Sequence, residues 1–189
     1  MTINKELWGW LYGFLGVLIF SLTLPATRIA VAELDPAFVG LGRAVIAGGL
    51  AIILITLTRQ SIPPTRFWLR FVVVAVGVVV GFPLLTAIAM KNAPASYGAV
   101  IIGLMPLATA LYGVWRGKEQ VTQSFWLFAL MGSGLVIVFA VQSGTKSLSA
   151  TDLALFGAVV SAGVGYGEGA ILGRTFGAWQ VICWSLVLS

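Results

Sequence analysis

The chain has 189 residues, of which 59% are hydrophobic and only 9% are charged, whereas charged residues make up roughly a quarter of a soluble globular protein. This composition excludes an ordinary water-soluble domain. The net charge of +5 comes from 11 lysines and arginines that stand singly along the chain, so it does not indicate a surface that binds nucleic acid.

The hydrophobic residues gather in six blocks of about 20 residues, the length that a helix needs to cross the hydrocarbon core of a membrane. Short polar or proline-containing connections separate the blocks, which makes consecutive helices antiparallel neighbours. We therefore expect an all-α fold, a polytopic membrane helix bundle with six complete transmembrane helices. The six blocks are residues 8–32, 36–57, 67–90, 96–115, 125–141 and 153–173.

The first block could also belong to a cleaved signal peptide, because Lys5 precedes it and Ala30-Val31-Ala32 imitates a cleavage site. The hydrophobic region of a signal peptide has only about 7 to 15 residues. The first block runs well past that length before it meets Arg28. We therefore interpret it as a retained transmembrane helix.

A seventh hydrophobic run, residues 179–189, has about 11 residues and would form a helix roughly 16 Å long. A helix of this length does not cross the core, and its end would leave polar backbone unsatisfied in lipid. We expect a seventh helix that is truncated within this sequence.

The orientation follows from the cations, because lysine and arginine in short loops stay on the cytoplasmic side of a membrane. With the N-terminus inside, the outer connections hold only Lys91 and Lys146, and most tryptophans lie at cytoplasmic helix ends, where their rings prefer the interface. We expect an integral protein of a bacterial plasma membrane with a cytoplasmic N-terminus. Its cytoplasmic cations are Lys5, Arg59, Arg66, Arg70, Arg116, Lys118 and Arg174.

The sixth block resembles the first at an offset of 146 residues, since Leu7 corresponds to Leu153, Phe20 to Tyr166 and Arg28 to Arg174. Five spans separate the two starts, and an odd number inverts the second copy relative to the first. The expected organisation is a first five-helix repeat over residues 1–144 and the start of an inverted second repeat over residues 150–189.

Several motifs stand at helix ends and breaks. They are Ser21-Leu-Thr-Leu-Pro25, Leu34-Asp-Pro36 with Arg43 in the same helix, the stretch 95–106 ahead of Glu119, and the tail 177–184. With these motifs the chain resembles the EamA-type transporters of the drug/metabolite transporter superfamily. The resemblance implies two five-helix repeats with ten helices in all, so that three and a half helices of the second repeat are missing here.

Glu168 is the only acid well inside a predicted span, and an embedded carboxylate can load and release a proton as its surroundings alternate between wet and dry. It is the candidate for proton coupling. The alternative is an ion pair with Arg70, Arg116 or Arg174 at the inner boundary. The glycines around it indicate either close helix packing or a flexible segment beside a substrate path; they are Gly163, Gly165, Gly167, Gly169 and Gly173.

Arg43 lies about seven residues into the second helix, where a charge faces a cavity or a partner, or snorkels to the interface. Both interpretations stay open, whereas Arg28 is expected to snorkel beside Glu33 or Asp35. Prolines inside spans kink helices and free carbonyl groups. The remaining substrate-path candidates are such prolines and intramembrane hydroxyl groups, namely Ser21, Thr23, Pro25, Thr86, Tyr97, Pro106 and Tyr166.

The leading hypothesis is a secondary transporter that exports small metabolites or amino acids by alternating access, in contact with membrane lipids and with a homodimer partner or a missing C-terminal half. The lack of histidine excludes Ser-His hydrolases and HExxH metalloenzymes, and the single Cys183 excludes an intrachain disulfide. We expect no enzymatic activity, metal or cofactor. The alternatives are a membrane-embedded enzyme acting on lipid-linked substrates and a non-transporting membrane subunit or gene fragment.

Overall fold

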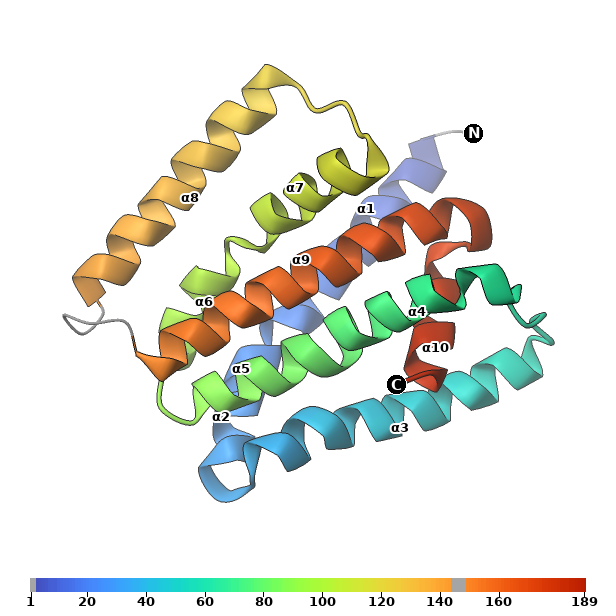
Figure 1. Cartoon of the computed structure of the whole chain (residues 1–189), viewed down its shortest axis with the longest axis horizontal. Helices are drawn as coiled ribbons and strands as arrows, with labels where there is room; N and C mark the ends of the chain where they lie inside the picture. Colours follow the sequence, from blue (N-terminus) through green and yellow to red (C-terminus); the bar gives the residue numbers. More distant parts are fainter. Residues whose placement is uncertain (1–2, 144–148) are drawn as a thin grey trace.

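The computed structural model describes residues 3–143 and 149–189, which form a bundle of helices with no strand in these ranges (Figure 1). In chain order the elements are α1 (Ile3–Ser21), α2 (Thr23–Glu33), α3 (Pro36–Leu57), η1 (Thr65–Phe67), α4 (Trp68–Val74), η2 (Ala75–Gly81), α5 (Phe82–Met90), α6 (Ala95–Ile102), α7 (Met105–Gly117), α8 (Gln123–Ser143), α9 (Ala150–Phe176) and α10 (Ala178–Val187).

Six helical segments within the described ranges are long and apolar enough to cross a membrane. This confirms the predicted polytopic helix bundle, and the protein is an integral membrane protein. The shorter apolar helix α10 follows the sixth segment, where a seventh helix was expected. The six segments are Glu6–Glu33, Pro36–Leu57, Thr65–Met90, Ala95–Gly117, Gln123–Ala140 and Ala150–Phe176.

Helix α3 has the bounds that its sequence predicts, because Asp35 before the helix and Pro36 at its first position both favour a helix start. The Asp35 carboxylate accepts a hydrogen bond from the Ala37 amide at 2.8 Å and caps the helix. Pro36 occupies the first position, where no amide donor is needed.

Two of the spans contain a break about one turn before a proline. The first span is interrupted at Leu22, ahead of Pro25, and the fourth at Gly103, ahead of Pro106. A proline has no amide hydrogen and its ring crowds the carbonyl four residues earlier, so the helix is interrupted there. The kinks predicted at the prolines therefore lie in the turns that precede them.

The third span changes helix type in its middle. The seven residues of η2 form a π-helix, a rare conformation that is frequent at functional sites. The carbonyl of Gly77 accepts the Phe82 amide of its own span and also the Ser161 hydroxyl of α9, at 3.0 Å. Hydropathy alone predicted a continuous α-helix here, because it does not distinguish helix types.

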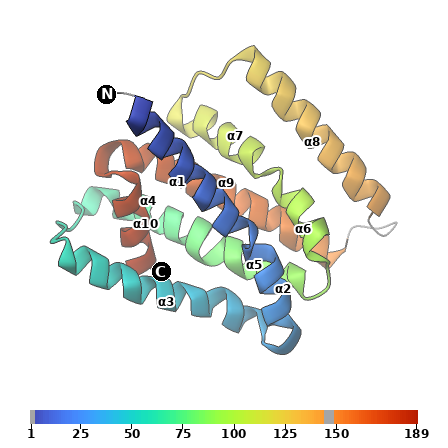
Figure 2. The same ribbon diagram turned by 180° about the vertical axis from the view of Figure 1, so that it is seen from behind.

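Helix α9 is the central element of the bundle. It packs against α4, η2 and α5 on one side and against α6 and α7 on another, while α10 turns back between α9 and α3. Half of its apolar window is buried, whereas none of the window of α8 is. Figure 1 shows α8 at the edge of the bundle, and Figure 2 shows α1 crossing the rear face.

Three of the predicted α9 glycines allow close helix contact. A Cβ atom at Gly163 would lie 2.6 Å from the Cβ of Ala108, and one at Gly165 would lie 2.9 Å from the backbone nitrogen of Val78. Gly167 lies against the ring of Tyr112 in the same way. Close packing is therefore the role of these three residues.

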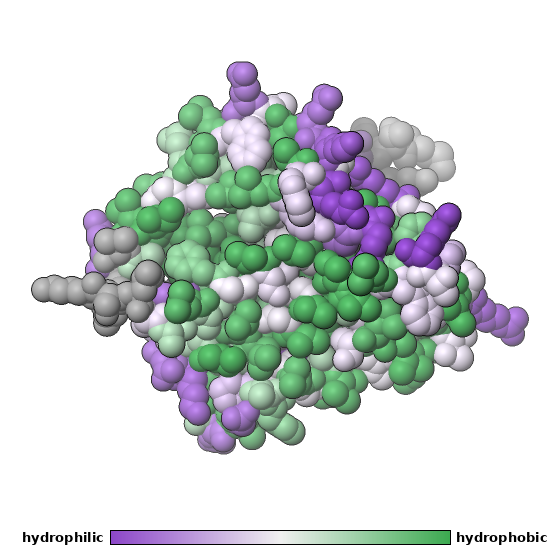
Figure 3. All heavy atoms as spheres, in the orientation of Figure 1, coloured by the Kyte–Doolittle hydropathy of each residue, from purple (hydrophilic) through white to green (hydrophobic). Residues whose placement is uncertain are grey.

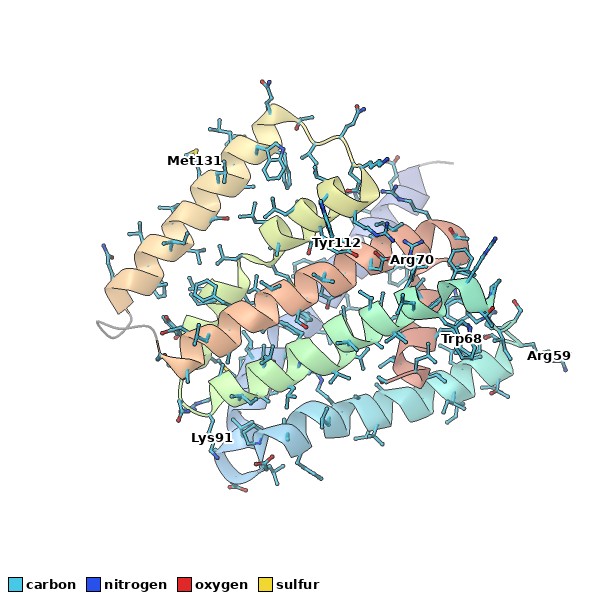
Figure 4. The ribbon with its side chains drawn as sticks, in the orientation of Figure 1. Arg59, Trp68, Arg70, Lys91, Tyr112 and Met131 are labelled. Carbon is cyan, nitrogen blue, oxygen red and sulfur yellow. The ribbon has the colours of Figure 1, made fainter. Side chains whose placement is uncertain are left out.

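The polar residues gather at two ends of the bundle, with a continuous apolar band between them (Figure 3). We call one of them the basic end, where α3, α7 and α9 finish and α4 begins. Arg59 and Arg70 lie there, and Lys91 lies at the opposite end (Figure 4). Within the predicted connection 142–152, residues 144–148 lie outside the described residues, and with them Lys146 and the repeat boundary at residue 144.

Gly77 offers a test of the α9 contact, because its substitution brings a methyl group against the backbone of Gly165 at 2.7 Å. We expect Gly77→Ala to destabilise the protein by about 1–3 kcal/mol through overpacking. Gly132→Ala on α8 is the matched control, since nothing lies within 4 Å of its Cβ position. Thermal unfolding in detergent should show a lower Tm for the first variant only; equal Tm values would contradict the packing.

Candidate functional site

Two open pockets lie on either side of one residue, Tyr166. The first, of about 430 Å³, is called the α7 pocket and the second, of about 470 Å³, the α10 pocket. The α7 pocket is lined by Met105, Pro106, Thr109, Ala110, Glu119, Phe125 and Tyr166. The α10 pocket is lined by Val74, Val78, Gly165, Tyr166, Gly169, Ala170, Gly173, Arg174, Ala178, Val181 and Ile182.

Tyr166 belongs to both linings, and its side chain is 38% exposed. Its hydroxyl makes no hydrogen bond within the described residues. Because α9 rises 1.5 Å per residue, Tyr166 stands roughly 24 Å from the start of the helix, in its middle third. The structure thus brings together two of the predicted path residues, Tyr166 and Pro106, near mid-span.

One face of α9 continues from Tyr166 toward the basic end. Gly169, Ala170, Gly173 and Arg174 follow at spacings of three, four, seven and eight residues, which places them on the same side of the helix. A Cβ at Gly169 or Gly173 would meet nothing nearer than 3.7 Å. These two glycines line the α10 pocket, unlike the three that hold close contacts.

Arg43 lies on α3 with an exposed side chain, near enough to Tyr166 for an electrostatic interaction between the two residues. No ion pair or hydrogen bond holds its guanidinium in the part of the chain that the structure describes. Arg43 is therefore the candidate cation of the path, and the choice between a cavity and snorkelling stays open.

Glu168 is 2% exposed and joins three helices near the basic end. Arg70 of α4 donates a hydrogen bond to one carboxylate oxygen, and Tyr112 of α7 donates to the other at 2.6 Å. The guanidinium of Arg116 lies 4.0 Å from the same carboxylate. Figure 4 shows Arg70 and Tyr112 at this end of α9. The structure shows the ion-pair alternative, and proton coupling by Glu168 stays a prediction.

Sequence reasoning missed Tyr112 as a partner of this carboxylate, although a signal was present. Tyr112 and Arg116 are four residues apart, so they lie on one face of α7 and reach the same group. The sequence analysis also named Arg174 as a third possible partner of Glu168. Arg174 instead forms an ion pair with Glu119, just after α7.

The Arg174–Glu119 pair differs from the Glu168 cluster in its exposure. Its side chains are 61% and 36% exposed, respectively. An ion pair in such surroundings contributes about 0–1 kcal/mol, whereas removing one partner of a buried pair costs about 3–5 kcal/mol. The first pair can therefore open easily, and the Glu168 cluster holds α4, α7 and α9 together.

Several of the predicted hydroxyl candidates bond to their own helices. The Ser21 hydroxyl donates to the Leu18 carbonyl at 2.7 Å, and the buried Thr86 hydroxyl donates to the Phe82 carbonyl at 2.8 Å. Such bonds satisfy the hydroxyl group locally. Thr23 and Pro25 lie in the first turn after the break at Leu22, away from both pocket linings.

Two residues fasten the opposite end of the bundle. The Tyr97 hydroxyl of α6 donates to the Asp152 carboxylate of α9 at 2.7 Å. Arg28, expected to snorkel beside Glu33 or Asp35, forms no ion pair with either acid within the described residues; it donates to the carbonyls of Met90 and Lys91, the latter at 2.7 Å. Carbonyl groups at the C-terminal end of a helix lack intrahelical partners and attract cations, which explains the position of the guanidinium at the end of α5.

The comparisons with known proteins agree with the resemblance seen in the sequence. The model of the EamA-like transporter family matches residues 7–141. Over 187 residues the chain is 50% identical to the uncharacterized transporter YdeK of Bacillus subtilis (strain 168). This alignment covers 99% of the chain and 65% of the relative, so the chain spans just under two thirds of that relative's length. No solved structure matches the chain significantly.

The two carboxylates offer a matched pair of substitutions. Glu168→Gln removes the buried charge to which Arg70 and Tyr112 are bonded, so we expect a loss of about 1.5–3 kcal/mol in unfolding free energy, the usual value of hydrogen bonds to a charged group. Glu119→Gln should cost about 1 kcal/mol or less, because its ion pair is exposed. Denaturation in mixed detergent micelles measures both values, and equal losses would refute the difference in burial.

Proposed function

The chain belongs to the EamA-like transporter family, and we propose that it carries a small metabolite or an amino acid out of the cell by alternating access. The family and the relative named as a transporter point to a transporter rather than an enzyme. The observation that carries the proposed route is the position of Tyr166, which faces two pockets from the middle third of the central helix.

The proposed path runs along the face of α9 that begins at Tyr166 and continues through Gly169, Ala170 and Gly173. Its walls in the α10 pocket are almost entirely apolar side chains, so the solute has room there for an apolar part. Pro106 and Thr109 line the other pocket just after the break in the fourth span. Interrupted helices beside a mid-membrane site are typical of secondary transporters.

Arg43 is the proposed polar contact of this path. A charged residue inside a span costs about 2.5–3.5 kcal/mol on insertion scales, and such residues usually face a cavity or a partner. Tyr166 lies within electrostatic range of it. A solute that passes between them would meet one charged and one aromatic polar group.

We propose that the protein resides in the bacterial plasma membrane with its N-terminus and the basic end in the cytoplasm. The support is the concentration of arginines at one end of the bundle, which the positive-inside rule associates with the cytoplasmic side. Glu168 remains a candidate for proton coupling, because opening of its arginine contacts would change its affinity for a proton.

The proposed organisation is a first repeat over residues 1–144 and an inverted second repeat that begins at residue 150. The family match over residues 7–141 supports the first of these limits. Helices α1 and α8 expose apolar side chains on most of their surface. We propose that a C-terminal half or a second copy of the chain contributes further helices to the working transporter.

The enzyme alternative has less support, because the acids that it would use are engaged. Glu168 is bonded to Arg70 and Tyr112, and Glu119 is paired with Arg174. A non-transporting subunit is the other alternative, and solute flux measurements distinguish it from a transporter.

Flux into proteoliposomes tests the proposed path. With the natural full-length protein, we expect transport of at least one labelled solute from a panel of metabolites and amino acids under an imposed proton gradient. Ala170→Trp should lower that flux at least tenfold, because the indole fills the α10 pocket. Met131→Trp on the lipid-facing side of α8 is the control and should keep the flux (Figure 4). No flux of any solute would count against the transporter itself.

Substitution of Arg43 decides between its two interpretations. If the guanidinium contacts the solute, Arg43→Gln should raise KM roughly tenfold or more, and Arg43→Lys should restore part of the affinity. Arg59→Gln, in the exposed connection after α3, is the control for a general change in charge. An unchanged KM in Arg43→Gln would favour snorkelling.

A further inference from the structure

The Arg174–Glu119 ion pair connects the linings of the two pockets. Arg174 lines the α10 pocket and Glu119 lines the α7 pocket, and their side chains are bonded to each other. Tyr166 belongs to both linings. The two pockets therefore share one tyrosine, and one ion pair joins a lining residue of the first pocket to a lining residue of the second.

The ion pair stands between Tyr166 and the basic end. Arg174 follows Tyr166 by eight residues, or roughly 12 Å along α9. The residues between them on this face, Gly169, Ala170 and Gly173, have no side chain larger than a methyl group. A solute that leaves Tyr166 along this face reaches the ion pair next.

Glu119 is held in place by the end of α7. Its carboxylate oxygen would lie 2.8 Å from a Cβ at Gly113, and its Cγ would lie 3.5 Å from one at Gly117. Lys118, in a left-handed conformation, turns the chain so that Glu119 folds back over these two glycines. On the other side, Gly177 reverses the chain three residues after Arg174. The pair thus joins two turning points of the backbone.

We propose that the Arg174–Glu119 ion pair is a gate at the basic end of the solute path. When the pair is formed, it bridges the ends of α7 and α9 and closes the route to Tyr166. When it breaks, the two ends separate and the route opens. The proposal rests on the path proposed above. The exposed pair can exchange with water, while the buried Glu168 cluster keeps the neighbouring helices together.

Thiol labelling tests the gate without knowledge of the solute. Ala170→Cys is placed in a Cys183→Ser background, and membrane vesicles of either orientation are treated with a charged, membrane-impermeant methanethiosulfonate reagent. Opening the gate by Glu119→Gln or Arg174→Gln should raise the labelling rate of Cys at position 170 at least fivefold from the basic end. The exchanged pair E119R/R174E should return the rate toward its original value.

A cysteine introduced at Met131 on α8 is the control, because its labelling should not depend on either substitution. Unchanged labelling at position 170, an increase only from the opposite side, or an increase at both positions alike would overturn the gate. So would an exchanged pair that labels as fast as the single variants.

A second measurement separates the gate from the proposed function. In the natural full-length protein, Glu119→Cys with Arg174→Cys should form a disulfide on oxidation, and flux should stop and return on reduction. Flux that persists in the cross-linked protein overturns the gate while transport stands. If the uncross-linked protein shows no flux, the proposed function fails, and the labelling rates still decide the gate.

Discussion

Close backbone contact along α9 is the constraint on which the arrangement of the other helices depends. Gly165 lies against Gly77 of the π-helical segment, and Gly163 and Gly167 lie against α7. Lipid supplies no hydrophobic force between helices, so packing of small residues and polar contacts must hold the bundle together. The remaining small residues of α9 line the α10 pocket. One helix therefore provides both the close packing contacts and a wall of the proposed path.

Polar contacts complete this packing at two levels of burial. Near the basic end, the buried carboxylate of Glu168 binds Arg70 and Tyr112 and lies 4.0 Å from the exposed Arg116, whereas both members of the Arg174–Glu119 pair are exposed. The buried group holds three helices in one arrangement. The exposed pair lies at the end of the pockets, and breaking it changes the stability of the protein only slightly. A protein that must stay folded while its proposed solute path opens and closes benefits from having one strong polar cluster and one weak ion pair.

Hydropathy predicted much of the fold. The six spans and the start of α3 at Asp35-Pro36 depend on local properties, which one sequence contains. The partners of Glu168 could not be chosen in this way, because Arg70 is 98 residues distant and Arg116 and Arg174 lie at a similar depth. The hydrogen bond from the Ser161 hydroxyl to the Gly77 carbonyl could not be predicted either, because the composition of the two segments does not specify a π-helix.

The candidate site shows the same division. Arg43, Tyr166 and Pro106 were selected as polar or kinking residues inside spans, and the fold places the last two at one pocket. Ser21, Thr86 and Tyr97 were selected by the same criterion, yet each has a partner in its own helix or at the bundle's opposite end. Residue type reveals which groups need a partner, and only the packing reveals which partner they have.

The π-helical segment of the third span has a consequence for how this protein can vary. A π-helix accommodates more residues per turn than an α-helix, so the segment 75–81 contains length that a regular helix would not need. Loss of one residue there could be absorbed by a return to α-helical geometry, with Phe71 and Met90 kept in their buried positions. The same loss in α9 would turn every later side chain to a different neighbour. The third span should therefore tolerate the loss of one residue in this segment better than α9 does.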